Sequence, residues 1–98
     1  MKKLILALAL IPLAAHAEDH RVIQKGRRFT PPEISIRAGD SLTFTNDDEF
    51  IHQMYSDDLF DSDERKPGQA LTQAFNRSGT FEVRCHIHPK MKLVVHVN

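Results

Sequence analysis

Apolar and polar residues alternate along several short segments of this 98-residue chain, and turn-forming residues separate the segments. Successive side chains of a strand point to opposite faces of its sheet, so each alternating segment can bury one apolar face. β-branched residues favour strands in these segments, and almost no stretch has helical spacing. The pattern predicts a β-sandwich with strands near residues 21–23, 33–37, 41–45, 71–75, 80–85 and 93–97. The expected core consists of Ile34, Ile36, Leu42, Phe44, Phe81, Val83, Cys85, Leu93, Val95 and Val97. Residues 56–69 are expected to form a loop that could hold a short helix.

The start of the chain has the pattern of a secretory signal peptide. Lys2 and Lys3 precede an apolar run over residues 4–13, and Ala15-His16-Ala17 provides a small-x-small cleavage signal. The run is too short to span a bilayer comfortably, and no second apolar segment follows, which disfavours a membrane anchor. We therefore expect a cleaved signal peptide at residues 1–17, one domain at residues 18–98, and export to the periplasm.

The charge balance of the expected mature domain excludes some classes of partner. Cleavage after Ala17 would leave eleven Lys and Arg against thirteen Asp and Glu, a net charge of about −2. Nucleic acids and anionic membranes both require a basic patch, so neither is expected as a partner. We expect a monomer with no membrane span after cleavage.

The chain contains a single cysteine, Cys85, which cannot form an internal disulfide. A domain of this size buries only part of its surface, on the order of 60–65%. Small exported domains often compensate with disulfides. A bound metal would supply another way to stabilise the fold and would give the unpaired thiol a role.

The densest chemistry lies in the loop that follows the predicted strand at 80–85. Cys85, His88 and Met91 are spaced three residues apart, so a thiolate, an imidazole and a thioether can surround one ion. Two His, one Cys and a weak axial Met are the ligands of an electron-transfer copper site. The best candidate for the second histidine is His52, in a loop that a sandwich could bring beside Cys85.

Other interpretations of these residues remain open. Zinc also binds Cys and His, but structural zinc sites normally lack a thioether, so Met91 favours copper. A buried Cys is more often a small apolar residue. A nucleophilic Cys85 activated by His88 would need an orienting Asn or Asp and a substrate pocket, and the sequence indicates neither. We therefore expect no enzymatic activity.

Taken together, residues 29–97 resemble the cupredoxins, the family of plastocyanin and amicyanin. The C-x-x-H-x-x-M spacing of Cys85, His88 and Met91 is most similar to that of amicyanin. The stretches that carry the resemblance are residues 29–31, 36–46, 52, 67–68, 78–85, 88–89 and 91.

The resemblance implies an all-β, Greek-key β-sandwich with one type 1 copper ion. By the resemblance, His52 and His88 would bind through ring nitrogens, Cys85 as a thiolate, and Met91 as the weak axial ligand. Two positions depart from the family. Gln53 stands where the family usually has Asn; its backbone N–H can still donate to the Cys sulfur, but a side-chain link to the other ligand loop is in question. His86 beside Cys85 is also unusual, and it would either point outward or perturb the site.

The implied function is a periplasmic carrier of single electrons between redox proteins. A c-type cytochrome or a copper or quinoprotein oxidoreductase would be the kind of partner. His88 would present its ring edge, and Ile87, Pro89 and Phe50 would form an apolar collar around it. The alternative is a periplasmic copper-binding protein for copper tolerance or trafficking, with His20 or His86 as additional sites.

Two further features carry additional hypotheses. A mature chain that begins at Glu18 would have His20 third, and a free amine followed by such a His can bind Cu(II) or Ni(II) in a square plane. The other feature is a set of acidic residues around His52, which predicts either solvated turns or a patch that steers a basic partner. They are Asp47, Asp48, Glu49, Asp57, Asp58, Asp61, Asp63 and Glu64.

Overall fold

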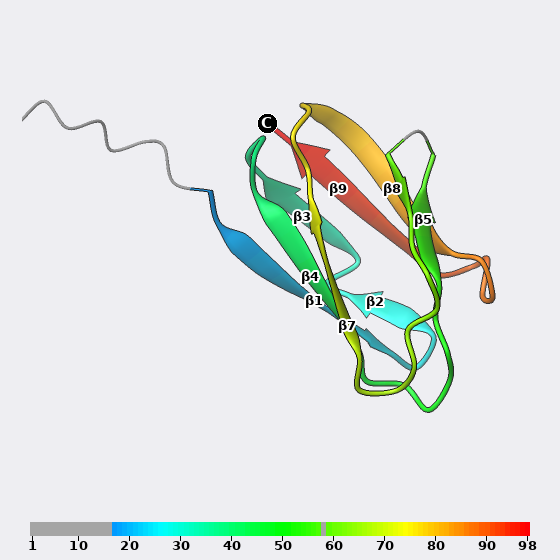
Figure 1. Ribbon diagram of the computed structural model, residues 1–98. Helices are drawn as coiled ribbons and strands as arrows, with labels where there is room; N and C mark the ends of the chain where they lie inside the picture. The colour runs from blue at the N-terminus through cyan, green and yellow to red at the C-terminus, as the bar shows by residue number, and fades with distance from the viewer. Residues whose placement is uncertain (1–16, 58) are drawn as a thin grey trace, which may run out of the picture.

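The computed structural model describes residues 17–57 and 59–98, which form strands and turns and no helix (Figure 1). The expected signal peptide lies almost entirely outside the described residues. The described residues thus contain no helix long and apolar enough to cross a membrane. The strands are β1 (Asp19–Lys25), β2 (Arg28–Thr30), β3 (Glu33–Ile36), β4 (Ser41–Asn46), β5 (Met54–Ser56), β6 (Phe60–Asp61), β7 (Ala70–Ala74), β8 (Gly79–Cys85) and β9 (Lys92–Val97).

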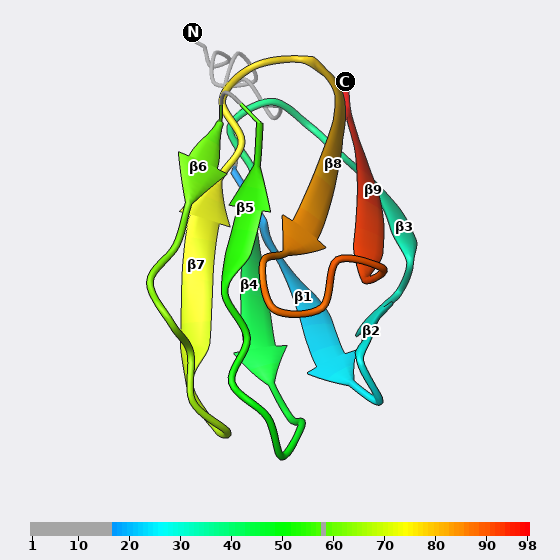
Figure 2. The same ribbon diagram turned by 90° about the vertical axis from the view of Figure 1, so that its right-hand side faces the viewer.

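The strands form two sheets that face each other, as Figures 1 and 2 show. One sheet has the order β2-β1-β4-β7, and the other has the order β3-β9-β8-β5-β6. β1 runs parallel to β4, β3 runs parallel to β9, and the remaining pairs are antiparallel. The prediction of an all-β, two-sheet sandwich is confirmed.

The predicted core is largely confirmed. Leu42, Phe44, Val83, Leu93 and Val95 are fully buried, as the alternation requires. Each such side chain contributes about 1.5–3 kcal/mol relative to an exposed one. Ile34 and Phe81 are only partly buried and pack against this core. Ile34 lies on β3, which is an edge strand and therefore has a sheet neighbour on one side only.

Residues 56–69 contain no helix among their described members. Instead, Phe60 and Asp61 form the two-residue strand β6 against β5, and His52 makes an isolated antiparallel bridge with Arg65. This bridge holds the segment alongside the loop that precedes β5.

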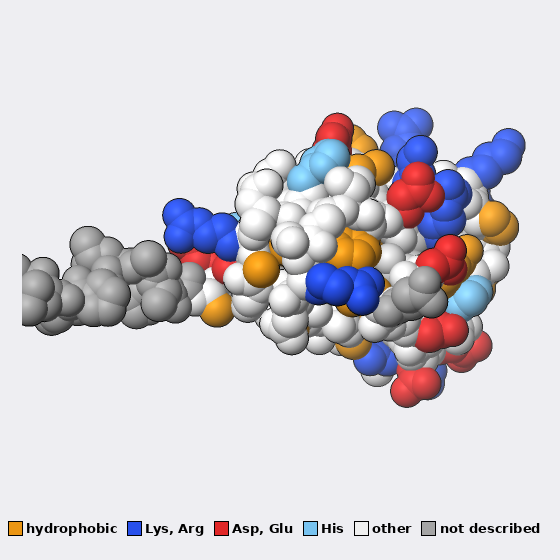
Figure 3. Space-filling model, turned by 90° about the horizontal axis from the view of Figure 1, so that it is seen from above, with side chains coloured by type: hydrophobic (Ala, Val, Ile, Leu, Met, Phe, Trp, Pro, Cys, Tyr) orange, Lys and Arg blue, Asp and Glu red, His pale blue; other side chains and the backbone are white. Residues whose placement is uncertain are grey.

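The end of the sandwich seen in Figure 3 carries Lys and Arg side chains interspersed with Asp and Glu. This view therefore shows none of the single-sign basic surface that nucleic-acid binding requires.

Candidate metal centre

Cys85 is the last residue of β8, and the alternation of that strand turns its thiol into the core. Val83 and Cys85 are both fully buried on the inner face. In the same sheet, β5 pairs with β8 so that Met54 lies opposite Cys85. This register brings the residues just before β5 to the sulfur.

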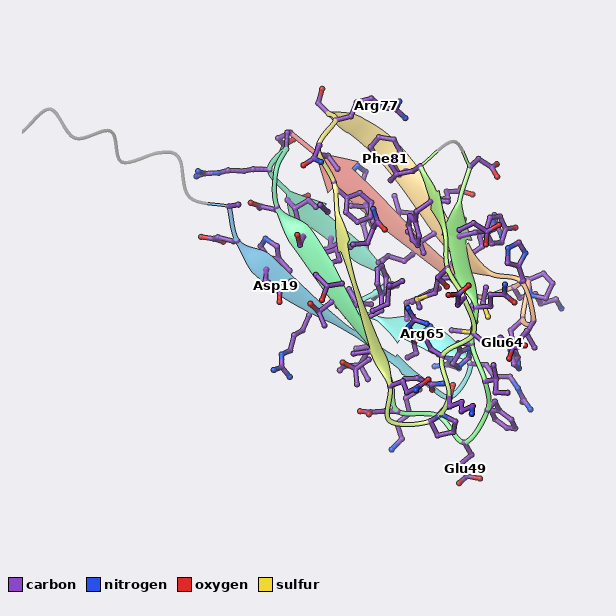
Figure 4. The ribbon with its side chains drawn as sticks, in the orientation of Figure 1. Asp19, Glu49, Glu64, Arg65, Arg77 and Phe81 are labelled. Atoms are coloured by element: carbon purple, nitrogen blue, oxygen red, sulfur yellow. The ribbon has the colours of Figure 1, made fainter. Side chains whose placement is uncertain are left out.

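His52 is fully buried, and its backbone is held on both sides by Arg65. The N–H of His52 donates to the Arg65 carbonyl at 3.0 Å, and the Arg65 N–H donates to the His52 carbonyl at 2.7 Å. Arg65 and its neighbour Glu64 are labelled in Figure 4, on the segment that runs beside this loop. These bonds fix the backbone of His52, and the Nδ1 atom of its ring lies 3.4 Å from the Cys85 sulfur.

His88 completes a group of three donors. Its ring centroid lies 5.2 Å from that of His52, and one donor atom from each of His52, Cys85 and His88 lies within 4.8 Å of the others. The Nδ1 atom of His88 is buried and has no hydrogen-bond partner among the described residues. An unpaired, buried imidazole nitrogen beside a thiol fits a metal ligand, since buried polar atoms otherwise find partners.

Met91 is buried in the same loop. Its N–H donates to the His88 carbonyl at 2.9 Å, and it lines a surface hollow of ≈ 390 Å³ together with His88 and Pro89. Its thioether therefore belongs to the same short turn as the second imidazole.

Burial and neighbouring side chains act on His88. Burial lowers the pKa of its imidazole, and electrostatic interactions with His52 and Arg27 lower it further, against a smaller opposing effect of Asp48. The ring is accordingly favoured in its neutral form, which leaves a lone pair for a metal ion.

Gln53, which replaces the Asn usual in the family, keeps the expected backbone contact with Cys85, but its side chain bonds elsewhere. Its backbone N–H donates to the Cys85 sulfur at 3.4 Å. Its side-chain Nε2 instead donates to the carbonyl of Ser62 at 3.1 Å. The link to the loop after β8 is made by backbone atoms, because the His86 N–H donates to the Gln53 carbonyl at 2.8 Å.

The residue that orients His52 could not be recognised from the sequence. The Nε2 atom of His52 lies 2.8 Å from Oδ2 of Asp48, a carboxylate that is only 8% exposed. Because a carboxylate only accepts hydrogen bonds, Nε2 carries the proton and Nδ1 presents its lone pair toward Cys85. The expectation of a solvated acidic turn is therefore wrong for Asp48.

The β1–β2 turn holds that carboxylate in place. Gly26 and Arg27 both have positive φ, 64° and 56°, and their N–H groups donate to Asp48 at 2.6 and 3.0 Å. Burial raises the pKa of Asp48, but the hydrogen bonds from His52, Arg27 and Gly26 outweigh it, and the net pKa is below its usual value. Asp48 is thus held as a carboxylate. No local pattern could reveal this, since the turn lies some twenty residues away along the chain.

The other described histidines stand apart from this group. His86 is exposed, stacks on Tyr55 with ring centroids 4.0 Å apart, and lies 3.0 Å from Asp61, so it points outward. His20 belongs to a separate group with Glu18 and Asp40, and His96 pairs with Glu33.

Comparisons with known proteins agree with this geometry. Residues 3–95 match the family model of the cupredoxin-like domain. Amicyanin-alpha of Methylorubrum extorquens is 32% identical over 71 residues, which cover 66% of this chain and 60% of that protein. The chain thus spans less than two thirds of that relative. Methylamine utilization protein MauL of the same organism is 27% identical over 94 residues, covering 92% of this chain and 82% of that protein.

Solved structures show the same fold. A purple cupredoxin from Nitrosopumilus maritimus superposes with a TM-score of 0.76 at 24% identity, covering 81% of this chain and 99% of that one. A copper-containing nitrite reductase from Thermus scotoductus gives a TM-score of 0.74 at 23% identity, covering 95% of this chain but 25% of that one.

His52, Cys85, His88 and Met91 form the pattern of a type 1 copper site, and copper is the ion that such a set of imidazole, thiolate and thioether takes. Because the family model covers almost all of the sequence and the two-sheet fold agrees with it, this chain belongs to the cupredoxin family.

Proposed function

We propose that this protein is a periplasmic carrier of single electrons, with copper held by His52, Cys85, His88 and Met91. The observation that supports it best is the convergence of two buried donors, His52 and Cys85, and the half-buried His88 within 4.8 Å. Copper in such a set of ligands accepts and releases one electron. The similarity to amicyanin-alpha points in the same direction.

The chain's own contribution is to keep the donors fixed. Backbone hydrogen bonds to Arg65 and the side chain of Asp48 hold His52, and the Gln53 amide donates to the sulfur. Donors fixed in this way before copper binds need little rearrangement when the charge of the site changes.

We also propose that a redox protein docks around His88. Phe50, Ile51 and Ile87 are large apolar residues that are 41%, 36% and 46% exposed, and the Phe50 ring lies 5.8 Å from that of His88. Weak redox encounters use small interfaces, which this patch could supply. A c-type cytochrome or a copper or quinoprotein oxidoreductase would be such a partner.

An enzymatic role is not part of the proposal. Two imidazoles, a thiolate and a thioether would occupy the coordination positions of a type 1 copper ion, so no coordination position is left for a substrate. The nitrite reductase that shares this fold is about four times longer, since the matched region is 25% of its chain.

One observation favours a second candidate, a protein for copper tolerance or trafficking. Glu18, His20 and Asp40 place donor atoms within 4.8 Å of one another, apart from the first group. A copper buffer would use such a site as well, and would bind more than one copper ion.

Voltammetry and metal counting of the copper-loaded protein test the proposal. We expect one copper per chain and a reversible one-electron wave that disappears in Cys85→Ser. His86→Ala is the matched control, because His86 points away from the group, and it should keep the wave. Two tightly bound copper ions without a reversible wave would favour the buffer instead.

A further inference from the structure

Asp40 carries a buried carboxylate that has no part in the metal centre. Its side chain lies just before β4, and the residue is 3% exposed. Oδ1 accepts a hydrogen bond from the backbone N–H of Glu18 at 2.9 Å, and Oδ2 accepts one from the N–H of Arg37 at 3.0 Å. The ring of His20 lies 3.0 Å from Oδ2.

Glu18 is also the residue that begins the described fold. Its carbonyl accepts a hydrogen bond from the Ser41 N–H at 2.8 Å, and the parallel pairing of β1 with β4 starts one residue later, at Asp19. Asp19 is labelled in Figure 4, at the start of β1. The backbone of Glu18 is therefore held through both its nitrogen and its oxygen.

The expected cleavage signal, Ala15-His16-Ala17, ends immediately before this residue. We propose that Asp40 is a binding site for the chain's own new α-amino group, created when a signal endopeptidase cleaves the bond between Ala17 and Glu18. Water supplies the oxygen that leaves as the Ala17 carboxylate. Both of its protons end on the Glu18 nitrogen, which becomes an ammonium group.

The cleavage changes the charge of the group that donates to Asp40 from the Glu18 nitrogen. In the uncleaved chain a neutral amide N–H faces Asp40, whereas in the mature chain a full positive charge faces it. Hydrogen bonds between two charged groups are roughly twice as strong as neutral ones. An α-amino group with an ordinary pKa of about 7.7–8.0 is mostly protonated at pH 7.

The ionisation state of Asp40 suits a positively charged α-amino group. Hydrogen bonds from the backbone of Arg37 and Glu18 and from His20 lower its pKa to about 2, so the carboxylate is charged at neutral pH. The mature domain would gain a buried ion pair that the leader-bearing chain lacks. Removal of the leader would thus stabilise the fold after export.

The same contact competes with the square-planar copper site that the sequence suggested at His20. That site needs the free amine and the backbone nitrogens of the next two residues. Here the Glu18 nitrogen is bound to Asp40, and Asp19 and His20 pair with β4. One amine cannot serve both purposes.

The test compares two copper-loaded chains, one beginning at Glu18 and one beginning at Ala17, each with and without Asp40→Asn. We expect the Glu18 chain to melt about 4–8 °C higher, the shift that follows from roughly one charge-assisted contact in a domain of this size. In Asp40→Asn that difference should disappear. Equal melting temperatures, or a difference that persists in Asp40→Asn, would overturn the proposal.

A second comparison covers the case in which Asp40→Asn does not fold. The Glu18 chain with an acetylated amine has the same residues and no terminal charge, so it should melt lower than the free-amine chain by a similar amount. Equal melting temperatures would again contradict the ion pair. Intact mass of the exported protein tests the premise, since a start other than Glu18 rules out the contact. The inference rests on the proposed export and not on copper, so a failed copper test leaves it standing.

Discussion

The Nε2 atom of His52 lies 2.8 Å from Oδ2 of Asp48, while the Nδ1 atom of the same ring lies 3.4 Å from the sulfur of Cys85. The carboxylate assigns the proton to Nε2 and leaves Nδ1 free on the side of the metal centre. A buried acid in the loop after β4, held by the β1–β2 turn, therefore decides how the first imidazole can bind.

Asp48→Asn should weaken copper binding about 10- to 100-fold and shift the reduction potential, because the amide removes the charge that fixes the His52 ring. A competition titration with a copper chelator and voltammetry measure the two effects. Asp47→Asn is the matched control, since Asp47 is the exposed neighbour. Equal affinity and potential in Asp48→Asn and wild type would show that Asp48 does not orient the ligand.

Acid should destabilise the domain in a window set by Asp40. Its pKa is lowered from 3.8 to about 2 in the folded state, so its stabilising effect is complete above about pH 4 and is lost as the pH falls toward 2. Denaturant unfolding of metal-free wild type at several pH values should show this loss. Asp40→Asn should show a smaller loss over the same range. Parallel pH profiles for the two proteins would contradict the assignment.

Cations beside His88 should make the protein react faster with anionic oxidants. Arg27 and Lys90 line the same hollow as His88 and Met91, and the Arg27 guanidinium lies 4.4 Å above the Phe50 ring. The oxidation rate with hexacyanoferrate(III) should fall with rising salt, and Lys90→Glu should lower it about three- to tenfold at low salt.

Arg77→Glu is the control for that experiment, because Arg77 lies at the other end of the sandwich from the loop between β8 and β9 (Figure 4). It should leave the rate nearly unchanged. If the rate instead rises with salt, the acidic residues near His52 dominate the field, as the sequence alone allowed.

Copper should stabilise the fold, since its ligands come from separate segments that the unfolded chain does not hold together. The melting temperature should rise when one equivalent of copper is added, and the rise should be smaller in Met91→Ala. Differential scanning calorimetry measures both. An unchanged melting temperature on copper addition would mean that copper does not bind the folded centre.

The sequence predicted those features that depend on neighbouring residues. Alternation located β4 and β8, and with β8 it placed Cys85 on the inner face at a strand end. The spacing of Cys85, His88 and Met91 then identified three of the four proposed ligands within one loop. The two-residue strand β6 escaped prediction because it is too short to show any periodicity.

Contacts between distant segments had to come from the structure. His52 could be named as the second histidine, but its approach to Cys85 depends on the pairing of β5 with β8. Asp48 looked like one more acid in a polar loop, and only the turn at Gly26 and Arg27 reveals its buried role. The outward position of His86 likewise depends on Tyr55 and Asp61 across the sheet.

The visible absorption spectrum of the Cu(II)-loaded protein tests the central claim most directly. We predict an intense thiolate-to-copper band that is lost in Cys85→Ser and retained in His86→Ala. A protein that stays colourless with copper and instead binds zinc at His52, Cys85 and His88 would contradict the account.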